Sequence, residues 1–311
     1  ELVRLLVRAE PVRMLVREEG EQQAATEMLE QAGVDTTRVR FYLCPTDRNW
    51  LRDTGPTFIK NSAGELGAVV WRFDGWGRFP AHKRDRRVAR WVAEAAHASY
   101  WELDFVLEGG AVDVNGEGLL LATEECLLRR VGCGEISRER WEKVFRDCLG
   151  VRRVVWLPWG LGEDETGGHV DQVARFVAPD TVVLAVTRDR AYPDFERVQE
   201  NLRVLKSLRD ALGVRLRVLE APLPEPVYFR GERLPASYLN FYVANGLVIV
   251  PVFNDPADRE ALNLLSECFP GREVVGLYSR DLVVGEGGPH CLTQQQPAAS
   301  RGTGRAWNQG P

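Results

Sequence analysis

Long hydrophobic runs are absent from this sequence of 311 residues. The longest apolar stretches, such as Leu247 to Phe253, contain a proline and fall far short of the roughly 20 residues that a membrane-spanning helix needs. We therefore expect no transmembrane segment and no membrane partner. A strong excess of one charge is absent too, because the formal net charge is −5 and the basic run from His82 to Arg90 is interrupted by Asp85. This balance predicts no nucleic-acid partner.

Reactive residue types are few. The six cysteines have neither the paired spacing of a zinc site nor the density of a disulfide scaffold, which favours a reducing compartment and a cytoplasmic protein. Only four histidines are present, so a general acid or base has to come from a short list. The rest of the composition, with 44% hydrophobic and 27% charged residues, is typical of a soluble globular protein.

Helical periodicity and turn signals alternate along the chain. Apolar residues at spacings of three and four predict helices at intervals of about 60 residues, and β-branched runs around Asn115-Gly116 and Asn245-Gly246 predict hairpins between them. The five helices are expected at residues 22–31, 84–98, 138–149, 194–212 and 256–268. The sequence therefore predicts an α/β fold of five repeated units, and if these close around an axis, the turns at one end of each unit converge on a shared site.

Four segments place ionisable side chains beside glycine or proline where strands are expected to end, and a fifth places an amide side chain there. Loops in such positions carry function because a rigid scaffold holds them. The segments are 50–56 (WLRDTGP), 107–110 (LEGG), 168–171 (GHVD), 285–291 (GEGGPHC) and 237–240 (SYLN).

Cys291 is the candidate nucleophile. It follows a glycine-rich turn that lets the thiol approach a substrate closely, and a thiolate is a strong nucleophile. The other five cysteines lack such a setting, and we interpret them as core or surface thiols, with a disulfide or a metal site at Cys126 and Cys133 as the lesser alternative.

His169 is the candidate general acid/base, because it alone among the histidines has glycine before it and a carboxylate two residues later. In a strand, His169 and Asp171 would face the same side and share a substrate. His290 would point away from Cys291 in an extended segment, which predicts a structural role for this histidine.

Asp53, Glu108 and Asp171 supply three carboxylates, and two that converge would hold a planar guanidinium cation bidentately. Two alternatives stay open, since Asp53 would also serve as the ion-pair partner of Arg52 and Glu108 as a cap for backbone amides. Trp50 would either stack on the bound cation or fill the core.

Together these segments resemble the family of agmatine deiminases and Porphyromonas-type peptidylarginine deiminases, in the pentein superfamily of guanidino-group-modifying enzymes. The signatures are WLRDTGPTF (50–58), LEGGAVDVNGEG (107–118), TEECLL (123–128), ETGGHVDQVARF (165–176), ASYLNFYVANGLVIVPVF (236–253) and GGPHCLTQQQP (287–297). The resemblance implies a five-bladed, pseudo-symmetric α/β propeller. The residues that it implies are, for catalysis, Cys291, His169, Asp53 and Asp171 and, for substrate binding, Trp50, Glu108 and Asn240.

The activity that the resemblance implies is hydrolysis of agmatine to N-carbamoylputrescine and ammonia through a covalent thiouronium on the cysteine, without a metal or an organic cofactor. Deimination of peptidylarginine or free arginine is the alternative enzymatic reading, and a catalytically silent guanidinium-binding protein is the non-enzymatic one. The nucleophile segment departs from the usual GGGNIHC at Glu286, Gly288 and Pro289, which would alter the loop or the rate.

Residues 1–297 are expected to form one catalytic domain, and residues 298–311, rich in glycine, proline and small polar residues, a flexible tail. Nothing like the family's usual opening segment, EWEPHxxxWxxWP, precedes Glu1, so the first blade is expected to be incomplete. A homodimer is the default expectation for assembly.

Overall fold

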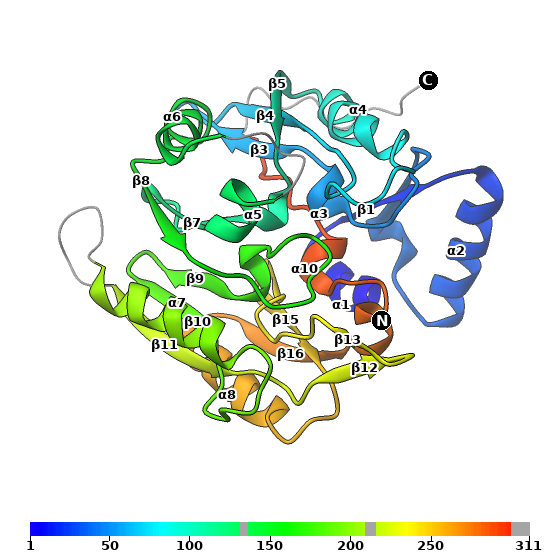
Figure 1. Ribbon diagram of the computed structural model, residues 1–311. Coiled ribbons are helices and arrows are strands. Elements are labelled where there is room, and N and C mark those ends of the chain that lie inside the picture. The colour runs from blue at the N-terminus through cyan, green and yellow to red at the C-terminus, as the bar shows by residue number, and fades with distance from the viewer. Residues whose placement is uncertain (131–135, 209–215, 300–311) are drawn as a thin grey trace.

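Five small sheets, each associated with one longer helix, form most of the chain (Figure 1). The computed structural model describes residues 1–130, 136–208 and 216–299. Four of the sheets share one pattern, in which two antiparallel strands are followed by a helix and by a third strand parallel to the second. Their elements are β3 (Thr57–Lys60), β4 (Leu66–Arg72), α4 (Val88–Ala95) and β5 (Ser99–Val106); β6 (Val112–Val114), β7 (Leu119–Thr123), α6 (Arg138–Leu149) and β8 (Arg153–Leu157); β9 (Ala174–Ala178), β10 (Thr181–Val186), α7 (Phe195–Ser207) and β11 (Arg217–Pro222); β14 (Tyr242–Ala244), β15 (Leu247–Val252), α8 (Asp258–Cys268) and β16 (Glu273–Tyr278).

The remaining sheet has two parallel strands, β1 (Val12–Val16) and β2 (Val39–Leu43), joined through α2 (Glu19–Gln31). A separate hairpin pairs β12 (Val227–Phe229) with β13 (Glu232–Leu234). Each of the five expected helices is confirmed, as α2, α4, α6, α7 and α8. Within the described ranges, no helix combines the length and the apolar character needed to cross a membrane.

Local sequence explains the strands and helices. The strand β10, TVVLAV, is buried at every position between antiparallel β9 and parallel β11, as expected for a central strand covered on both faces. Helix α6 begins where the Ser137 side chain accepts a hydrogen bond from the Arg140 amide, and it ends at Gly150, which has a left-handed φ of 68°. Both signals are visible in the sequence, and the expected bounds of α6 are those observed.

The bounds of other helices differ from the expected ones. The helix expected at 84–98 is a short 3-10 turn, Asp85–Arg87, followed by α4, and it stops before His97, which has a left-handed φ of 52°. Helix α7 ends at Ser207, and the rest of the expected stretch mostly lies outside the described residues. Cys133 and residues 300–311 of the expected tail (298–311) also lie outside the described residues.

A helix that the sequence did not predict, α1 (Leu2–Ala9), packs the first residues of the chain against the last sheet. Its Leu5 and Leu6 are buried against Tyr242, Leu247 and other residues of the last sheet. In Figure 1 helices α2, α4, α6, α7 and α8 lie towards the periphery, whereas the short helices α3 (Leu51–Thr54) and α10 (Pro289–Leu292) lie near the centre.

Candidate active site

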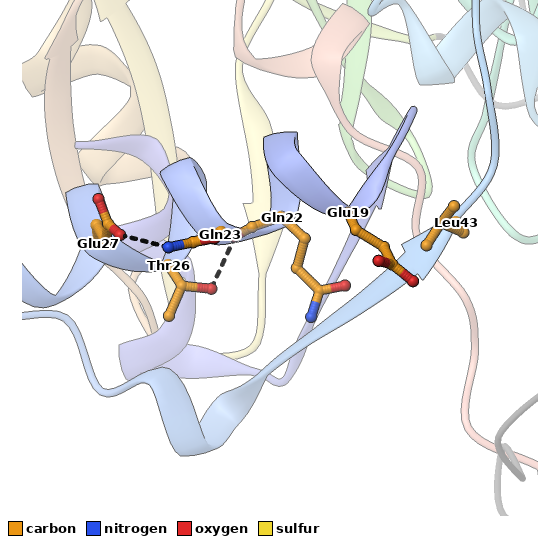
Figure 2. A pocket seen from close by; sticks show the side chains of 6 residues that line it. All are labelled: Glu19, Gln22, Gln23, Thr26, Glu27 and Leu43. Atoms are coloured by element: carbon orange, nitrogen blue, oxygen red, sulfur yellow. Dashed lines mark hydrogen bonds between the residues drawn. The ribbon is translucent and has the colours of Figure 1, made fainter.

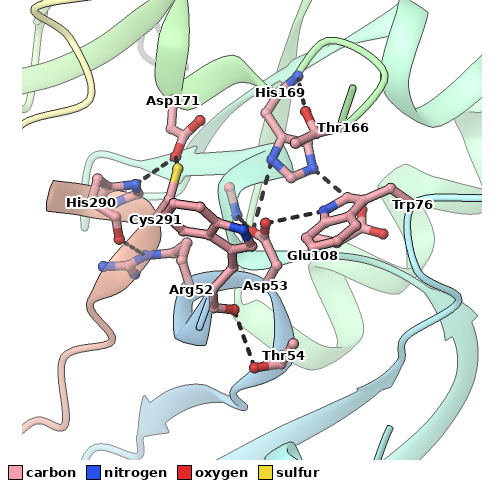
Figure 3. Close-up of polar contacts among 12 residues, drawn as sticks. Arg52, Asp53, Thr54, Trp76, Glu108, Thr166, His169, Asp171, His290 and Cys291 are labelled. Atoms are coloured by element: carbon pink, nitrogen blue, oxygen red, sulfur yellow. Dashed lines mark hydrogen bonds and ion pairs between the residues drawn. The ribbon is translucent and has the colours of Figure 1, made fainter. Parts of the chain in front are cut away.

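The predicted site segments lie between one sheet and the next, and the fold brings them together. They comprise α3 before β3, the 3-10 turn Gly109–Ala111 before β6, the 3-10 turn Val170–Gln172 before β9, the residues before β14, and α10 after β16. Helix α3 contacts both α10 and the turn Gly109–Ala111, which in turn contacts Val170–Gln172. Figure 3 shows side chains of α3, of the turn Val170–Gln172 and of α10, together with those of Glu108 and His169, gathered around Cys291.

Cys291 is held by Asn240. The Asn240 Nδ2 donates to the Cys291 Sγ at 3.1 Å, and the Asn240 Oδ1 accepts from the Cys291 amide at 3.3 Å. Cys291 is buried, with 4% of the residue exposed. Burial, together with the carboxylates of Asp171 and Asp53, raises the pKa of the Cys291 thiol well above its ordinary value. The side chain is therefore a protonated thiol at neutral pH.

Asp171 has one satisfied oxygen and one open oxygen. Its Oδ2 lies 2.7 Å from the Nδ1 of His290, accepts from the Asn240 Nδ2 at 3.1 Å and lies 3.6 Å from the Cys291 Sγ. Its Oδ1 is buried and has no hydrogen-bond partner among the described residues. Burial raises the pKa of Asp171 to about 7, and the charges of Asp53 and Asp164 add to this effect.

His169 lies between two carboxylates. Its Nε2 is 3.4 Å from the Oε2 of Glu108, and its Nδ1 is 3.8 Å from the Oδ1 of Asp53. Although burial alone lowers the pKa of His169, Asp53, the Cys126 thiol and Glu108 outweigh it and raise the pKa well above its ordinary value. The imidazole is therefore protonated at neutral pH and has a proton to give.

Asp53 is oriented by donors from two other segments. The Gly110 amide donates to its Oδ1 at 3.2 Å, and the Trp76 indole Nε1 donates to its Oδ2 at 3.1 Å. The alternative in which Asp53 pairs with Arg52 does not hold, because the Arg52 guanidinium donates to the His290 carbonyl at 3.3 Å and to Gln295 at 2.7 Å.

Glu108 is a buried partner of Arg130. The two Arg130 nitrogens each lie 2.9 Å from one Glu108 oxygen, a bidentate ion pair. Burial opposes ionisation, but Arg130 and His169 outweigh it and lower the pKa of Glu108 to about 2. The alternative role of Glu108 as a helix cap is wrong, since its side chain makes no capping hydrogen bond to the turn Gly109–Ala111. Its carboxylate faces His169 instead.

Trp50 covers the glycine-rich nucleophile segment. A Cβ atom at Gly287 would lie 2.7 Å from the Trp50 ring, and one at Gly285 would lie 2.9 Å from it. The half-buried Trp50 ring therefore packs directly on the two glycines, where a larger residue would not fit. Trp50 packs on the loop that carries Cys291, and its predicted contact with a cation stays a prediction.

Two geometric expectations are wrong. His169 and Asp171 do not lie in a strand, because Val170–Gln172 is a 3-10 turn. His290 does not point away from the site, because Pro289 starts a short helix, α10, rather than an extended segment. Its Nδ1 therefore reaches Asp171, and burial with the nearby Arg175 and Arg52 cations lowers the pKa of His290 well below its ordinary value.

Comparison with known proteins shows the family of this chain. A model of the Porphyromonas-type peptidyl-arginine deiminase family matches residues 1–297. The chain belongs to this family. The agmatine deiminase of Pseudomonas fluorescens is 40% identical to it, with 96% of this chain and 86% of the relative covered.

Solved structures of related deiminases have the same mixed α/β fold. The agmatine deiminase of Enterococcus faecalis superposes with a TM-score of 0.88 at 32% identity, covering 95% of this chain and 86% of that one. A cysteine-to-serine variant of the C. jejuni agmatine deiminase with substrate bound has a TM-score of 0.86 at 26% identity, covering 96% and 86%.

Four residues of this deiminase site were not predicted as site residues from the sequence: Trp76, Arg130, Arg175 and Arg52, of which only Arg52 was named, as a partner for Asp53. Trp76 has a left-handed φ of 56° between Gly75 and Gly77, so a tryptophan between two glycines was a readable signal of a constrained turn. The three arginines had no such signal. Their contacts are made with residues distant in the chain and follow from the fold alone.

A surface hollow of about 430 Å³ lies elsewhere, between α2 and β2 (Figure 2). Its wall consists of Glu19, Gln22, Gln23, Thr26, Glu27 and Leu43. Gln23 already donates to Glu27 at 3.1 Å, and Thr26 to the Gln22 carbonyl at 2.8 Å. The lining side chains make local contacts within the helix and include no activated nucleophile, so the hollow is not a candidate for catalysis.

Proposed function

We propose that this protein is a cysteine-dependent hydrolytic deiminase that converts agmatine to N-carbamoylputrescine and ammonia. The observation that carries the proposal is the pairing of a buried thiol with a half-satisfied carboxylate: the Cys291 Sγ lies 3.6 Å from the Oδ2 of Asp171, whose buried Oδ1 has no hydrogen-bond partner among the described residues. The relatives named agmatine deiminase support the choice of substrate.

Substrate binding begins with the guanidinium group. Its planar array of N–H donors suits the open Oδ1 of Asp171 and the remaining lone pairs of Asp53. Two buried carboxylates select a cation and orient its plane. With the plane fixed, the central carbon of the guanidinium faces the Cys291 Sγ, which Asn240 holds in place.

The substrate itself activates the nucleophile. Without it, burial and the charges of Asp171 and Asp53 keep Cys291 protonated. A bound guanidinium cancels these charges and lowers the pKa of the thiol, so that it loses its proton and the thiolate attacks the carbon. The protein thus generates its reactive form only when the correct charge is present.

His169 then moves the protons. As the carbon–nitrogen bond breaks, its imidazolium donates a proton to the leaving nitrogen, which departs as ammonia and leaves a thiouronium on Cys291. The neutral imidazole next takes a proton from water, and the resulting hydroxide displaces the sulfur to form the ureido product. Glu108, itself held by Arg130, keeps the imidazole in place throughout.

The charges near the nucleophile segment favour agmatine over free arginine. Glu286 lies between Gly285 and Gly287, and burial, followed by the charges of Glu165 and Asp164, raises its pKa to about 8. At neutral pH Glu286 is therefore mostly protonated, and the acidic charges of this region are those of Glu165 and Asp164, partly opposed by Arg78. The distal ammonium of agmatine would be attracted there and would favour ionisation of Glu286, whereas the carboxylate of free arginine would be repelled.

The test is formation of ureido product from agmatine, a peptidylarginine substrate and free arginine, assayed in parallel. We expect turnover of agmatine, and a loss of at least about a thousandfold in Cys291→Ala, because no other group replaces the nucleophile. Cys268→Ala is the matched control, since this thiol lies on α8 outside the site and its removal leaves turnover intact. Folded wild-type protein without turnover of any substrate would instead indicate a silent guanidinium-binding protein.

We also propose an overall architecture, a domain extent, a cellular location and an assembly for this protein. We expect the five sheets to close around the site as a five-bladed propeller, with residues 1–297 acting as one catalytic domain. The free cysteines of the described residues support a reducing, cytoplasmic location. A homodimer is the assembly to test by light scattering.

A further inference from the structure

A second thiol lies beside His169. The side chains of Glu108, Cys126 and His169 each offer one metal-ligand atom, and these atoms lie within 4.8 Å of one another. All three residues are buried, with exposed fractions of 0% for Glu108 and Cys126 and 1% for His169. Cys126 is a free cysteine and neither forms a bond nor transfers a proton in the proposed reaction.

A single hydroxyl fixes Cys126 relative to His169. Cys126 lies in the first turn of α5 (Glu124–Leu128), where its amide donates to the Thr123 Oγ1 at 3.1 Å. The same Oγ1 donates to the carbonyl of Gly168 at 2.6 Å, one residue before His169. The position of the thiol beside the imidazole is therefore built into the fold rather than left to a flexible side chain.

The donor set and its spacing suit a zinc ion. Zn²⁺ binds thiolate, imidazole and carboxylate, often through three protein ligands and one open position. Bonds of about 2.0–2.3 Å in a tetrahedron place neighbouring ligand atoms about 3.3–3.7 Å apart. The Nε2 of His169 and the Oε2 of Glu108 are 3.4 Å apart, which already matches this spacing.

The surroundings also suit a metal ligand. When the Nε2 of a histidine binds a metal, its other nitrogen commonly faces a carboxylate that orients the ring. Here the Nδ1 of His169 lies 3.8 Å from the Oδ1 of Asp53. Arg130, which pairs with Glu108, also donates to the Thr166 carbonyl at 3.2 Å and lies 3.6 Å from Asp74, so it keeps partners when a metal binds Glu108.

We propose that Glu108, Cys126 and His169 form an inhibitory binding site for Zn²⁺ and similar thiophilic divalent ions. Binding releases the proton of the Cys126 thiol and occupies the Nε2 of His169. With Nε2 bound to the metal, the ring cannot become the imidazolium that the proposed reaction needs, and its single remaining proton stays on Nδ1, 3.8 Å from the Oδ1 of Asp53. Metal binding itself does not depend on the proposed function, whereas the inhibition rests on it.

The experiment separates the two thiols of the site with Co²⁺ as a spectroscopic probe. A thiolate bound to Co²⁺ has a near-ultraviolet charge-transfer band, so the band reports which cysteine binds. We expect one Co²⁺ per chain with this band in the wild type and in Cys291→Ala and Cys268→Ala. In Cys126→Ser and Cys126→Val we expect the band to be lost and the Kd for Zn²⁺ to rise at least about tenfold.

A band that survives in both Cys126 variants but disappears in Cys291→Ala would overturn the proposal and assign the metal to the nucleophile. Absence of binding by folded wild-type protein would overturn it as well. For the inhibition, we expect Zn²⁺ to stop agmatine turnover and a chelator to restore it, and turnover that continues at saturating Zn²⁺ would refute the inhibitory role. If no variant turns over agmatine, the proposed function fails, but the Co²⁺ band still tests the site.

Discussion

At the scale of single residues, the two oxygens of Asp171 set the chemistry of the site. One is satisfied by His290 and Asn240, and the other is buried without a hydrogen-bond partner among the described residues. A buried carboxylate with an open oxygen is costly in the free protein. In the proposed function a bound guanidinium offsets that cost, so we expect the site to be more stable with its substrate than without it.

The raised pKa of Asp171 predicts that replacing this carboxyl with a neutral group increases the stability of the fold, and does so more at high pH than at low pH. A free carboxyl ionises near pH 4, whereas Asp171 ionises at about 7, so the folded protein holds a proton that the unfolded chain has released. The stability contributed by this proton is present below pH 4 and is lost as the pH rises through 7. We therefore expect Asp171→Asn to be more stable than the wild type at pH 8 by about 2–4 kcal/mol, and by less at pH 5.

The measurement is chemical denaturation of both proteins at pH 5 and pH 8. Asparagine retains an oxygen that accepts from His290 and Asn240, so the comparison isolates the charge. The same variant should lose turnover. An equal change in stability at the two pH values would show that Asp171 is not a strained carboxylate.

A substitution at Gly110 tests where the substrate binds. A Cβ atom there would lie 2.5 Å from the Nδ1 of His169 and 3.1 Å from carboxylate oxygens of Asp171 and Asp53. We expect Gly110→Ala to lower kcat/KM for agmatine at least about a hundredfold, because the methyl group displaces the groups that hold the guanidinium. Gly20→Ala on α2 is the control, since its Cβ would meet nothing within 4 Å. Wild-type turnover in Gly110→Ala would place the substrate elsewhere.

At the scale of elements, β9 positions the nucleophile through Arg175. Its Nη1 donates to the carbonyls of Leu239 and Phe241, at 3.1 and 3.0 Å, on either side of Asn240. An ion pair with Asp113 at 2.8 Å holds the guanidinium. The contacts run from β6 through β9 to Asn240 and then to Cys291. We infer that Arg175 is a positioning residue that acts through the backbone on either side of Asn240.

We expect Arg175→Lys to lower kcat for agmatine at least about tenfold, with a smaller change in KM, because lysine keeps the charge but not the forked geometry. The rate at which iodoacetamide alkylates Cys291 should change as well, since it reports the setting of the thiol. Arg90→Lys, on the exposed face of α4, is the control. Reduced stability with unchanged kcat and alkylation would assign Arg175 a purely structural role.

At the scale of the whole molecule, α1 ties the first residues to the last sheet. Leu6 is 6% exposed and packs in the cluster that includes Tyr242, close to Asn240 in the chain. We expect Leu6→Ala to lower the free energy of unfolding by about 2–5 kcal/mol through the cavity it leaves. Arg4→Ala on the exposed face of α1 should cost less than about 0.5 kcal/mol. A loss below about 1 kcal/mol for Leu6→Ala in a urea titration would mean that α1 is not part of the cooperative core.

The sequence by itself determined the α/β class, the five long helices and the segments that carry the candidate site. Helical periodicity, caps such as Ser137 and Gly150, and the glycines beside Glu108, His169 and Cys291 are local features, so they act before the chain is folded. These patterns also carried the resemblance to the deiminase family. The helix α1 was missed, because eight residues give a short and ambiguous pattern.

Only the tertiary structure decided which side chains meet. Asp171 and His290 are 119 positions apart in the chain. Their contact depends on the helical conformation of α10, and a pattern of four residues around Pro289 is too short to predict a helix. The packing of the sheets likewise brings Arg175 close to Asn240 and Cys126 close to His169. The physical reason is that secondary structure follows from neighbouring residues, whereas pKa values, buried ion pairs and open hydrogen-bonding atoms follow from burial, which exists only in the folded chain.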